Sequence, residues 1–440
     1  MTLYMRCLAP AVALFLGLSL PAVGGDAATF RGDLAHTGVY AAAGVHGLPK
    51  IKWKFSTKGQ LISSPAVAAG LVYVGSTDGN LYAIEAESGE QKWKFETHVR
   101  ITSSPAVDHG AVYFGSYDGN FYAVDAASGK LKWKFQSRGE RRFAGKHLHG
   151  TQPEAEVMPD PFDFYLSSPA VSAGLAYFGS GDGNVYALQA DSGKLRWRFQ
   201  TGDVVHASPA IADGTIFIGS WDSYFYALDA ATGKKKWSFK TGEDHHIYNQ
   251  VGIQSSAAVM DGVVYFGCRD SNFYAVDIRT GRKKWAFNNQ GSWVISSPAV
   301  QDGKVYFATS DTGLLYELDA HSGAQVFSLP SQKWPMFSSP ALAGGMLYIG
   351  SHEGKLFAVD LKSQRFAWTF QTDASRQNGP ALTKPDGTPN YEAAFTEDFY
   401  DHLIIGVSRM LTVGAILASP VAADNVIYVG STDGNLYALQ

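Results

Sequence analysis

Residues 64–95 read SPAVAAGLVYVGSTDGNLYAIEAESGEQKWKF, and this stretch decides the fold. Short runs rich in Val, Leu and Tyr follow a Ser-Pro step, and Asp78-Gly79 and Ser88-Gly89 separate these runs from each other and from Trp93. Asp-Gly between two such runs favours a tight hairpin, because Gly accepts a positive φ. Proline cannot donate to a strand ladder, so Pro65 is expected at the start of an edge strand. The segment therefore predicts a small antiparallel sheet of four strands.

The same unit recurs along the chain with a period of roughly 40 residues, which is typical of β-propeller blades rather than of helical repeats. Unit starts and unit ends can be counted separately, and the two counts agree at eight. The starts are Pro65, Pro105, Pro169, Pro209, Ala257, Pro298, Pro340 and Pro420, and the ends are Trp53, Trp93, Trp133, Trp197, Trp237, Trp285, Phe327 and Trp368.

The two ends of the chain predict how the ring closes. The last unit stops at Gln440 after three strand signals, whereas the strand signal around Trp53 precedes the first unit start. Pairing these two segments completes the eighth blade and removes two exposed sheet edges. The predicted fold class is therefore all-β: an eight-bladed β-propeller of four-stranded antiparallel blades, closed by the N-terminal strand. It spans residues 50–440 and follows an N-terminal extension at 25–49.

The first residues resemble a secretory signal peptide, which we place at 1–24. Arg6 precedes an apolar run from Leu8 to Leu20, and small residues follow at 22–24. The apolar run is shorter than a confident membrane span, and no transmembrane segment is expected in the mature chain. We predict a periplasmic or secreted protein. Removal of the signal leaves Cys268 as the sole cysteine, and we expect it to be buried.

Charge narrows the classes of partner. The formal net charge is −4, with both signs interspersed. The sequence has no basic stripe, so nucleic acid is not an expected partner.

Three connections between repeat units are longer than the others, and they mark the predicted functional face. The spacing from Pro65 to Trp93 is repeated almost unchanged in the other units, so the blade body is nearly constant. The connections after Trp133, Trp237 and Trp368 are longer, which gives insertions at 138–164, 242–254 and 371–415. In a propeller these connections all lie on one face, so we expect them to surround one mouth of the central channel and to carry function.

Polar and aromatic residues in and around these insertions are the candidate ligand-binding groups. Arg269 occupies a hairpin near the channel mouth, where it can anchor a carboxylate or phosphate or pair with a carboxylate of the chain. Trp293 and Trp334 precede inner strands and can stack on a ligand or fill the channel. The paired histidines 245 and 246 favour hydrogen bonding over a metal site. The full candidate set is Arg142, His147, His149, Asp163, His206, His246, Tyr248, Asn249, Gln250, Arg269, Trp293, Trp334 and Arg409.

The candidate residues and insertions also have purely structural interpretations. Exposed charges in the first insertion can form a solvated loop held by internal ion pairs. The third insertion is predicted as a loop in its early part and as a short helix in its later part. The aspartates repeated in the hairpins are expected to serve turn geometry. They are Asp78, Asp118, Asp182, Asp222, Asp270, Asp311 and Asp433.

The segments AVDAASGKLKW at 123–133 and ALDAATGKKKW at 227–237 resemble the tryptophan-docking motif of the PQQ-enzyme repeat family. The resemblance covers residues 50–440 apart from the insertions, and it implies tryptophans that lock neighbouring blades together. The family includes dehydrogenases that hold PQQ and Ca²⁺ at the channel mouth and commonly have adjacent cysteines. It also includes a lipoprotein of the outer-membrane β-barrel assembly machinery. This chain has no adjacent cysteines and no haem motif.

Three functions follow as hypotheses. The first is an exported binding module that holds a small molecule or an envelope protein at its loop-rich face. The second is a PQQ- and Ca²⁺-dependent quinoprotein oxidoreductase acting on an alcohol or sugar, in which Asp163 or Asp401 is the candidate catalytic base and Arg269 anchors a PQQ carboxylate. The third is a scaffold for envelope assembly. The sequence contains no recognisable hydrolase motif.

Overall fold

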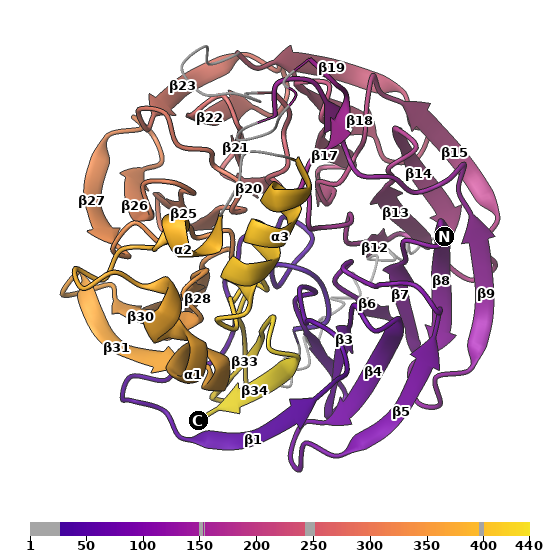
Figure 1. Ribbon diagram of the computed structural model, residues 1–440. Coiled ribbons are helices and arrows are strands. Elements are labelled where there is room, and N and C mark those ends of the chain that lie inside the picture. The colour runs from indigo at the N-terminus through magenta and orange to yellow at the C-terminus, as the bar shows by residue number, and fades with distance from the viewer. Residues whose placement is uncertain (1–26, 149–152, 154, 243–250, 396–399) are drawn as a thin grey trace, which may run out of the picture.

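The computed structural model describes residues 27–148, 153, 155–242, 251–395 and 400–440, with side chains for all of these except 400 and 401. Eight four-stranded antiparallel sheets surround a central axis as the blades of a propeller (Figure 1). The predicted fold class is confirmed, while the predicted signal peptide lies outside the described residues. No helix in the described ranges has the length and apolar character needed to cross a membrane.

Within each blade the chain runs from the innermost strand outward. Val, Ile, Tyr and Phe fill the second and third strands, which are buried on both sides by the neighbouring blades. Blade one consists of β2 (Ala66–Ala68), β3 (Leu71–Gly75), β4 (Asn80–Glu85) and β5 (Gln91–Glu96), and blade two consists of β6 (Ala106–Asp108), β7 (Ala111–Gly115), β8 (Asn120–Asp125) and β9 (Leu131–Gln136). Blade three consists of β12 (Ala170–Ser172), β13 (Leu175–Gly179), β14 (Asn184–Gln189) and β15 (Leu195–Gln200), and blade four consists of β16 (Ala210–Ala212), β17 (Thr215–Gly219), β18 (Tyr224–Asp229) and β19 (Lys235–Lys240). Blade five consists of β20 (Ala258–Met260), β21 (Val263–Gly267), β22 (Asn272–Asp277) and β23 (Lys283–Asn288), and blade six consists of β24 (Ala299–Gln301), β25 (Lys304–Ala308), β26 (Leu314–Asp319) and β27 (Gln325–Pro330). Blade seven consists of β28 (Ala341–Ala343), β29 (Met346–Gly350), β30 (Lys355–Asp360) and β31 (Arg365–Gln371), and blade eight consists of β32 (Val421–Ala423), β33 (Val426–Gly430), β34 (Asn435–Leu439) and β1 (Ile51–Ser56).

The ring closes as predicted. Strand β1 pairs antiparallel with β34, so that Trp53 lies opposite Ala438. Lys50 and Gln440 exchange main-chain hydrogen bonds of 2.7 and 2.9 Å. The eighth blade thus joins the first and last strands of the propeller: β34 is paired on both sides, and β1 forms the outer edge as the last strand does in every other blade.

Tryptophans on the outer strands hold neighbouring blades together. The indole Nε1 of Trp93 donates to the carbonyl of Ala126 in the next blade at 3.0 Å. Gly129 lies against the same indole with φ of +69°, and a Cβ there would meet the ring at 2.6 Å. Only glycine therefore satisfies both the turn and the contact. The side chain of Phe327 has no N–H group, so blade six lacks this hydrogen bond to the next blade.

Serines form a belt around the channel axis. The backbone N–H of Ser64 donates to Oγ of Ser104 at 3.0 Å, and the backbone N–H of Ser419 donates to Oγ of Ser64 at 2.9 Å. Equivalent bonds link blades two to seven in succession, which satisfies buried polar groups on the inner side of the ring. The belt consists of Ser64, Ser104, Ser168, Ser208, Ser256, Ser297, Ser339 and Ser419.

Residues 27–40 of the N-terminal extension close the channel on the face opposite the helices. The backbone N–H of Val107 donates to the carbonyl of Ala28 at 2.7 Å, and similar bonds tie residues 27–40 to inner strands of several blades. This is addition of backbone to exposed strand edges. The segment also buries Arg31, whose Nη2 donates to the carbonyl of Pro298 at 3.0 Å.

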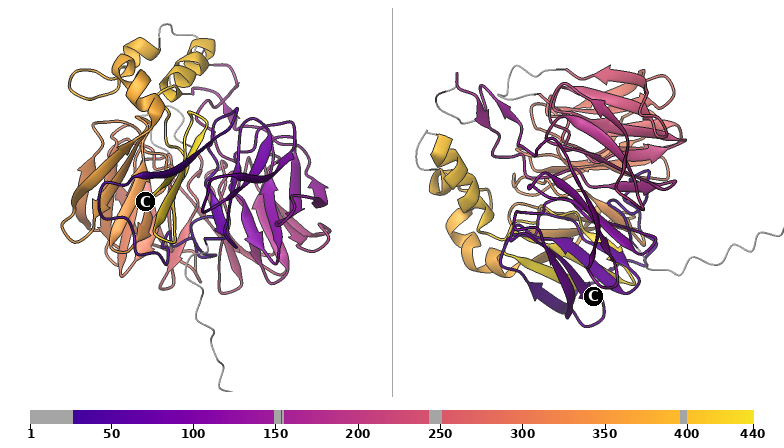
Figure 2. Two further views of the ribbon diagram at one scale, coloured as in Figure 1. Left: turned by 90° about the horizontal axis from the view of Figure 1, so that it is seen from below. Right: turned by 90° about the vertical axis from the view of Figure 1, so that its right-hand side faces the viewer.

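The insertions gather on the other face (Figures 1 and 2). The first forms a small ribbon of β10 (Ala144–Gly145) and β11 (Met158–Pro159), and the third forms three helices. The prediction of a loop in the early part of the third insertion is wrong. Thr372 caps a helix there by accepting a hydrogen bond from the backbone N–H of Ser375 at 3.2 Å, and this cap was not recognised because no apolar periodicity follows it. The helices are α1 (Asp373–Leu382), α2 (Tyr391–Ala394) and α3 (Tyr400–Leu411).

Candidate functional site at the channel mouth

Residues just before each inner strand line the channel with alternating side chains. Positions three residues before the repeated Pro face the axis above the serine belt, because side chains of extended backbone alternate in direction. His206, Gln254 and Phe337 occupy this position in three of the blades. The mouth is therefore built from positions that the repeat supplies and from the insertions above them.

Arg269 lies at the centre of this region and is fully buried. Its Nη1 lies 2.5 Å from Oδ2 of Asp160 in the first insertion, and its Nη2 donates to Oε1 of Gln254 at 2.9 Å. The guanidinium carbon lies 4.3 Å from the ring centroid of Trp221 and 4.2 Å from that of Trp293. An ion pair and two cation–π contacts therefore hold this arginine, and its charge is balanced by the chain itself.

His206 forms a second buried cluster with the same insertion. Its Nδ1 lies 2.8 Å from Oδ1 of Asp163, and its Nε2 lies 2.9 Å from Oε1 of Glu140. Burial alone would lower the pKa of His206, but the charges and hydrogen bonds of the two carboxylates outweigh it and raise the pKa to about 10. The other Asp163 oxygen accepts from the backbone N–H of Phe143 at 2.8 Å. The imidazolium thereby fixes the first insertion over the channel.

These clusters leave little room on the axis. The enclosed cavity between the serine belt and the mouth is about 30 Å³, which suits about one water. Asp160 and Asp163 are directed at Arg269 and His206, and the described residues contain no group of three His, Cys, Asp or Glu side chains that would hold a metal ion. The residues on the axis therefore do not fit PQQ with Ca²⁺.

An apolar pocket of about 420 Å³ lies beside the axis, between α3 and the inner ends of blades six and seven. Trp293, Phe162 and Phe337 line its floor, and the ring centroids of Phe162 and Trp293 are 5.8 Å apart. His352 also lines it; burial lowers the pKa of His352 to about 3, so its imidazole is neutral. Its Nε2 has no hydrogen-bond partner among the described residues. The remaining lining is supplied by Ser310, Asp311, Pro335, Tyr391, Phe395, Leu403, Val407, Met410 and Leu411.

A second pocket, of about 290 Å³, lies on the other side of α3 toward blades one and two. It contains the predicted residue Arg142 together with Arg100. Val407 and Leu411 of α3 border both pockets, so this helix divides the mouth into an apolar side and a cationic side.

The other predicted residues are placed as follows. Trp334 is buried, and its Nε1 donates to the carbonyl of Gly387 at 3.0 Å, so it fills space beneath the third insertion. Arg409 donates to the carbonyl of Ala394 at 3.1 Å. His147 is exposed. His149, His246, Tyr248, Asn249, Gln250 and the side chain of Asp401 lie outside the described residues.

Two structural readings from the sequence are confirmed, the first of them, the turn role, for six of the seven hairpin aspartates; Asp311 instead accepts from the hydroxyl of Ser310 at 2.7 Å. Asp78 accepts hydrogen bonds from the backbone N–H of Asn80 at 3.0 Å and from the hydroxyl of Tyr82 at 2.8 Å, which is turn geometry. Cys268 is fully buried, and burial raises the pKa of its thiol well above the usual range. This cysteine is packed as a small core residue and is not poised to react.

Sequence reasoning missed Arg100, His352 and Gln254 as residues of the mouth. Arg100 and Gln254 lie five and three residues before unit starts, and counting back in steps of two from the serine that precedes each start would have found both. His352 replaces the residue that follows Ser in the hairpin of other blades, as Arg269 does in its own. A comparison of equivalent hairpin positions identifies it by the same logic.

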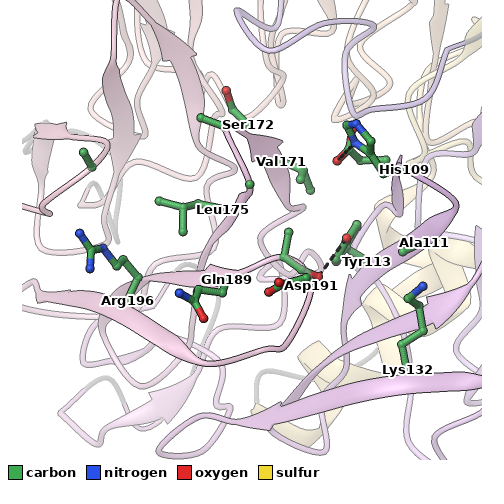
Figure 3. Close-up of a pocket in the computed structure, with 15 residues that line it drawn as sticks. His109, Ala111, Tyr113, Lys132, Val171, Ser172, Leu175, Gln189, Asp191 and Arg196 are labelled. Carbon is green, nitrogen blue, oxygen red and sulfur yellow. Dashed lines mark hydrogen bonds and ion pairs between the residues drawn. The ribbon is translucent and has the colours of Figure 1, made fainter.

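A further surface depression lies away from the mouth. It has a volume of about 800 Å³ and is lined by residues of blades two and three, among them His109, Lys132, Asp191 and Arg196 (Figure 3). These residues belong to repeated hairpins and outer strands, so the depression is a groove between neighbouring blades. It contains none of the residues predicted from the insertions.

Comparison of the sequence with known protein families identifies one matching family. A family model described as outer membrane protein assembly factor BamB matches residues 50–157, 165–370 and 287–440. No protein with a curated description matches.

Solved structures show the same fold. BamB from Moraxella catarrhalis is 16% identical with a TM-score of 0.65, covering 89% of this chain and 100% of that one. Quinohemoprotein alcohol dehydrogenase from Comamonas testosteroni is 14% identical with a TM-score of 0.66, covering 94% and 80%. The computationally designed Ika8 protein is 14% identical with a TM-score of 0.64, covering 89% and 99%. Because an assembly factor, an oxidoreductase and a designed protein are equally similar, the fold alone does not select a function.

Proposed function

The chain belongs to the family described as outer membrane protein assembly factor BamB, and from this premise we propose that it is an exported binding propeller. Its ligand is a small, flat, largely apolar molecule held between α3 and the inner ends of blades six and seven. The N-terminal apolar run supports export, since a signal peptide directs the chain across the membrane.

The observation that carries this proposal is the apolar pocket of about 420 Å³. That volume lies in the range of small-molecule sites, which are mostly apolar with a few polar groups that fix orientation. Trp293, Phe162 and Phe337 provide aromatic surfaces for stacking, and the neutral imidazole of His352 offers one hydrogen bond to the ligand.

Titration with N-phenyl-1-naphthylamine, a neutral fluorescent probe, tests the proposal. We expect saturable binding with one site per chain and quenching of tryptophan emission. Leu403→Trp should abolish binding, because this buried residue of α3 faces the pocket, whereas Ile405→Trp on the exposed side of α3 should leave binding unchanged. Absence of saturable binding to the folded protein, or equal binding by the Leu403 variant, contradicts the proposal.

An envelope-assembly scaffold is the second candidate, and the family match favours it. On that hypothesis the insertion-bearing face holds a protein of the envelope. Capture of one defined envelope protein by the wild-type chain, lost when residues 371–415 are replaced by a short linker, would support the scaffold over the small-molecule proposal.

The quinoprotein alternative is tested in parallel. Purified protein is mixed with PQQ and Ca²⁺ and assayed for quinone absorbance and for dye-linked alcohol oxidation. Since the axis is filled by Arg269 and its partners, we expect neither signal to exceed that of a sample without protein.

A further inference from the structure

The pocket on the other side of α3 is lined by groups that recognise anions. Arg100 and Arg142 lie in it with Gln60, Thr77 and Thr102 from blades one and two. The guanidinium carbon of Arg100 lies 3.8 Å from the ring centroid of Tyr117, which holds its planar group in place. A planar guanidinium offers paired N–H donors that match the oxygens of a carboxylate or phosphate.

The described part of the chain balances the positive charge of this pocket only in part, since Asp163 attracts Arg100 while the cluster that contains Asp163 and Glu140 already holds the imidazolium of His206. Among the residues described, neither Arg100 nor Arg142 forms an ion pair, whereas Arg269 and His206 nearby do. Asp163 is close, but its two oxygens are engaged by His206 and by the backbone N–H of Phe143. Burial is the main cause that lowers the pKa of Arg100; the neighbouring charge of Arg142 lowers it further, while Tyr117 and Asp163 act in the opposite direction. The two guanidiniums therefore oppose each other in a partly buried space.

Buried polar atoms in the same place also lack partners. The Oγ1 of Thr102 and the Nε of Arg142 are buried, and neither has a hydrogen-bond partner among the described residues. Thr102 is only 3% exposed and lines both this pocket and the channel below it. Unsatisfied buried donors are uncommon in folded proteins, so a site with these and two unpaired arginines indicates a missing acceptor.

We propose that Arg100 and Arg142 form a binding site for a small molecule bearing a carboxylate or a phosphate. The two guanidiniums hold its oxygens, and Thr102 donates a further hydrogen bond from the floor of the pocket. The volume of about 290 Å³ suits a small organic acid or phosphate ester. This site goes beyond the proposed function, since it lies on the opposite side of α3 and does not require the apolar pocket to be occupied.

Isothermal titration calorimetry at constant ionic strength tests the site with inorganic phosphate and with succinate, and uses uncharged succinamide as a control. We expect one-to-one binding of at least one anion, no binding of succinamide, and weaker binding at high salt. Arg100→Gln and Arg142→Gln should each weaken binding at least tenfold. The double variant Arg279→Gln/Arg282→Gln, at exposed positions around a turn on the other face, removes two positive charges, more than either single variant, and should still bind like the wild type.

Thermal unfolding separates a binding role from a structural one. If the two arginines bind an anion and do not stabilise the fold without one, Arg142→Gln should keep or raise the Tm in the absence of added anion. The variant should also lose the increase in Tm that the anion gives the wild type. A lowered Tm together with undiminished anion binding would overturn the proposal, and so would the absence of binding by the folded wild type to both anions. The naphthylamine titration is unaffected by either result, so failure of this site is distinguishable from failure of the apolar pocket.

Discussion

The two ends of the channel are both closed by the chain, but they are closed in different ways. At one end, residues 27–40 add backbone hydrogen bonds to the inner strands. At the other end, closure rests on side chains, with Arg269 between two tryptophans and His206 between two carboxylates. Side-chain closure is less uniform, and pockets remain on both sides of α3. The comparison shows that a repeat supplies the ring, whereas the inserted loops determine where a ligand has room.

The backbone closure is expected to contribute most to stability. Deletion of residues 25–44 removes the hydrogen bonds between residues 27–40 and the inner strands, and each such bond contributes about 0.5–1.5 kcal/mol net. We expect a loss of roughly 5 kcal/mol or more in the free energy of unfolding, measured by denaturant titration. A synthetic peptide of residues 25–44 should restore part of this loss. An unchanged midpoint would show that the segment only covers the ring.

Loss of the ion pair between Asp160 and Arg269 at the channel mouth is expected to have the second-largest effect on stability. Asp160→Ala leaves Arg269 buried without its counter-charge, which should cost about 3–5 kcal/mol. The double variant Asp160→Ala/Arg269→Met should be less destabilised than Asp160→Ala alone, because no charge is then left buried. Glu87→Ala breaks an exposed ion pair with Lys52 and should cost at most about 1 kcal/mol. Equal costs for Asp160→Ala and Glu87→Ala would contradict the account of the mouth.

The His206 cluster predicts a pH dependence. The folded-state pKa of about 10 lies above the usual value near 6.5, so the stabilisation is fully present below pH 6.5 and is lost as the pH rises toward 10. We expect the free energy of unfolding to fall by a few kcal/mol across this range. His206→Gln should remove that slope, while His109→Gln, at an exposed histidine beside Asp108, should keep it. A wild-type slope that survives in His206→Gln would refute the assignment.

The blade-locking hydrogen bonds should give the smallest effect. Trp285→Phe keeps most of the packing and removes the bond from Nε1 to the carbonyl of Ala320, so we expect a loss of about 1 kcal/mol. Blade six already has Phe327 at the equivalent position. Phe327→Trp serves as the reciprocal variant, and a large loss in Trp285→Phe would mean that packing, and not this bond, dominates.

The ring was predictable because each blade repeats the same local signals. Pro65, Asp78-Gly79 and Trp93 mark strand starts, turns and docking positions, and the terminal strands around Trp53 and Gln440 predicted the closure. The single-sided placement of the insertions followed from the same spacing. The fold needed no long-range information beyond the repeat.

The contents of the mouth were less predictable. Arg269 and His206 were singled out from the sequence, but their partners Asp160 and Glu140 depend on how a loop folds back over the channel. Nor does residue spacing predict that residues 27–40 enter the other end. Pairings across such distances in sequence depend on tertiary packing, which no local pattern encodes.

The most direct measurement is a crystal structure of the protein with N-phenyl-1-naphthylamine bound. We expect the probe between α3 and the aromatic floor formed by Trp293, Phe162 and Phe337, with Arg269 still paired to Asp160 on the axis. Density for the probe on the channel axis in place of Arg269, or only in the groove between blades two and three, would contradict it.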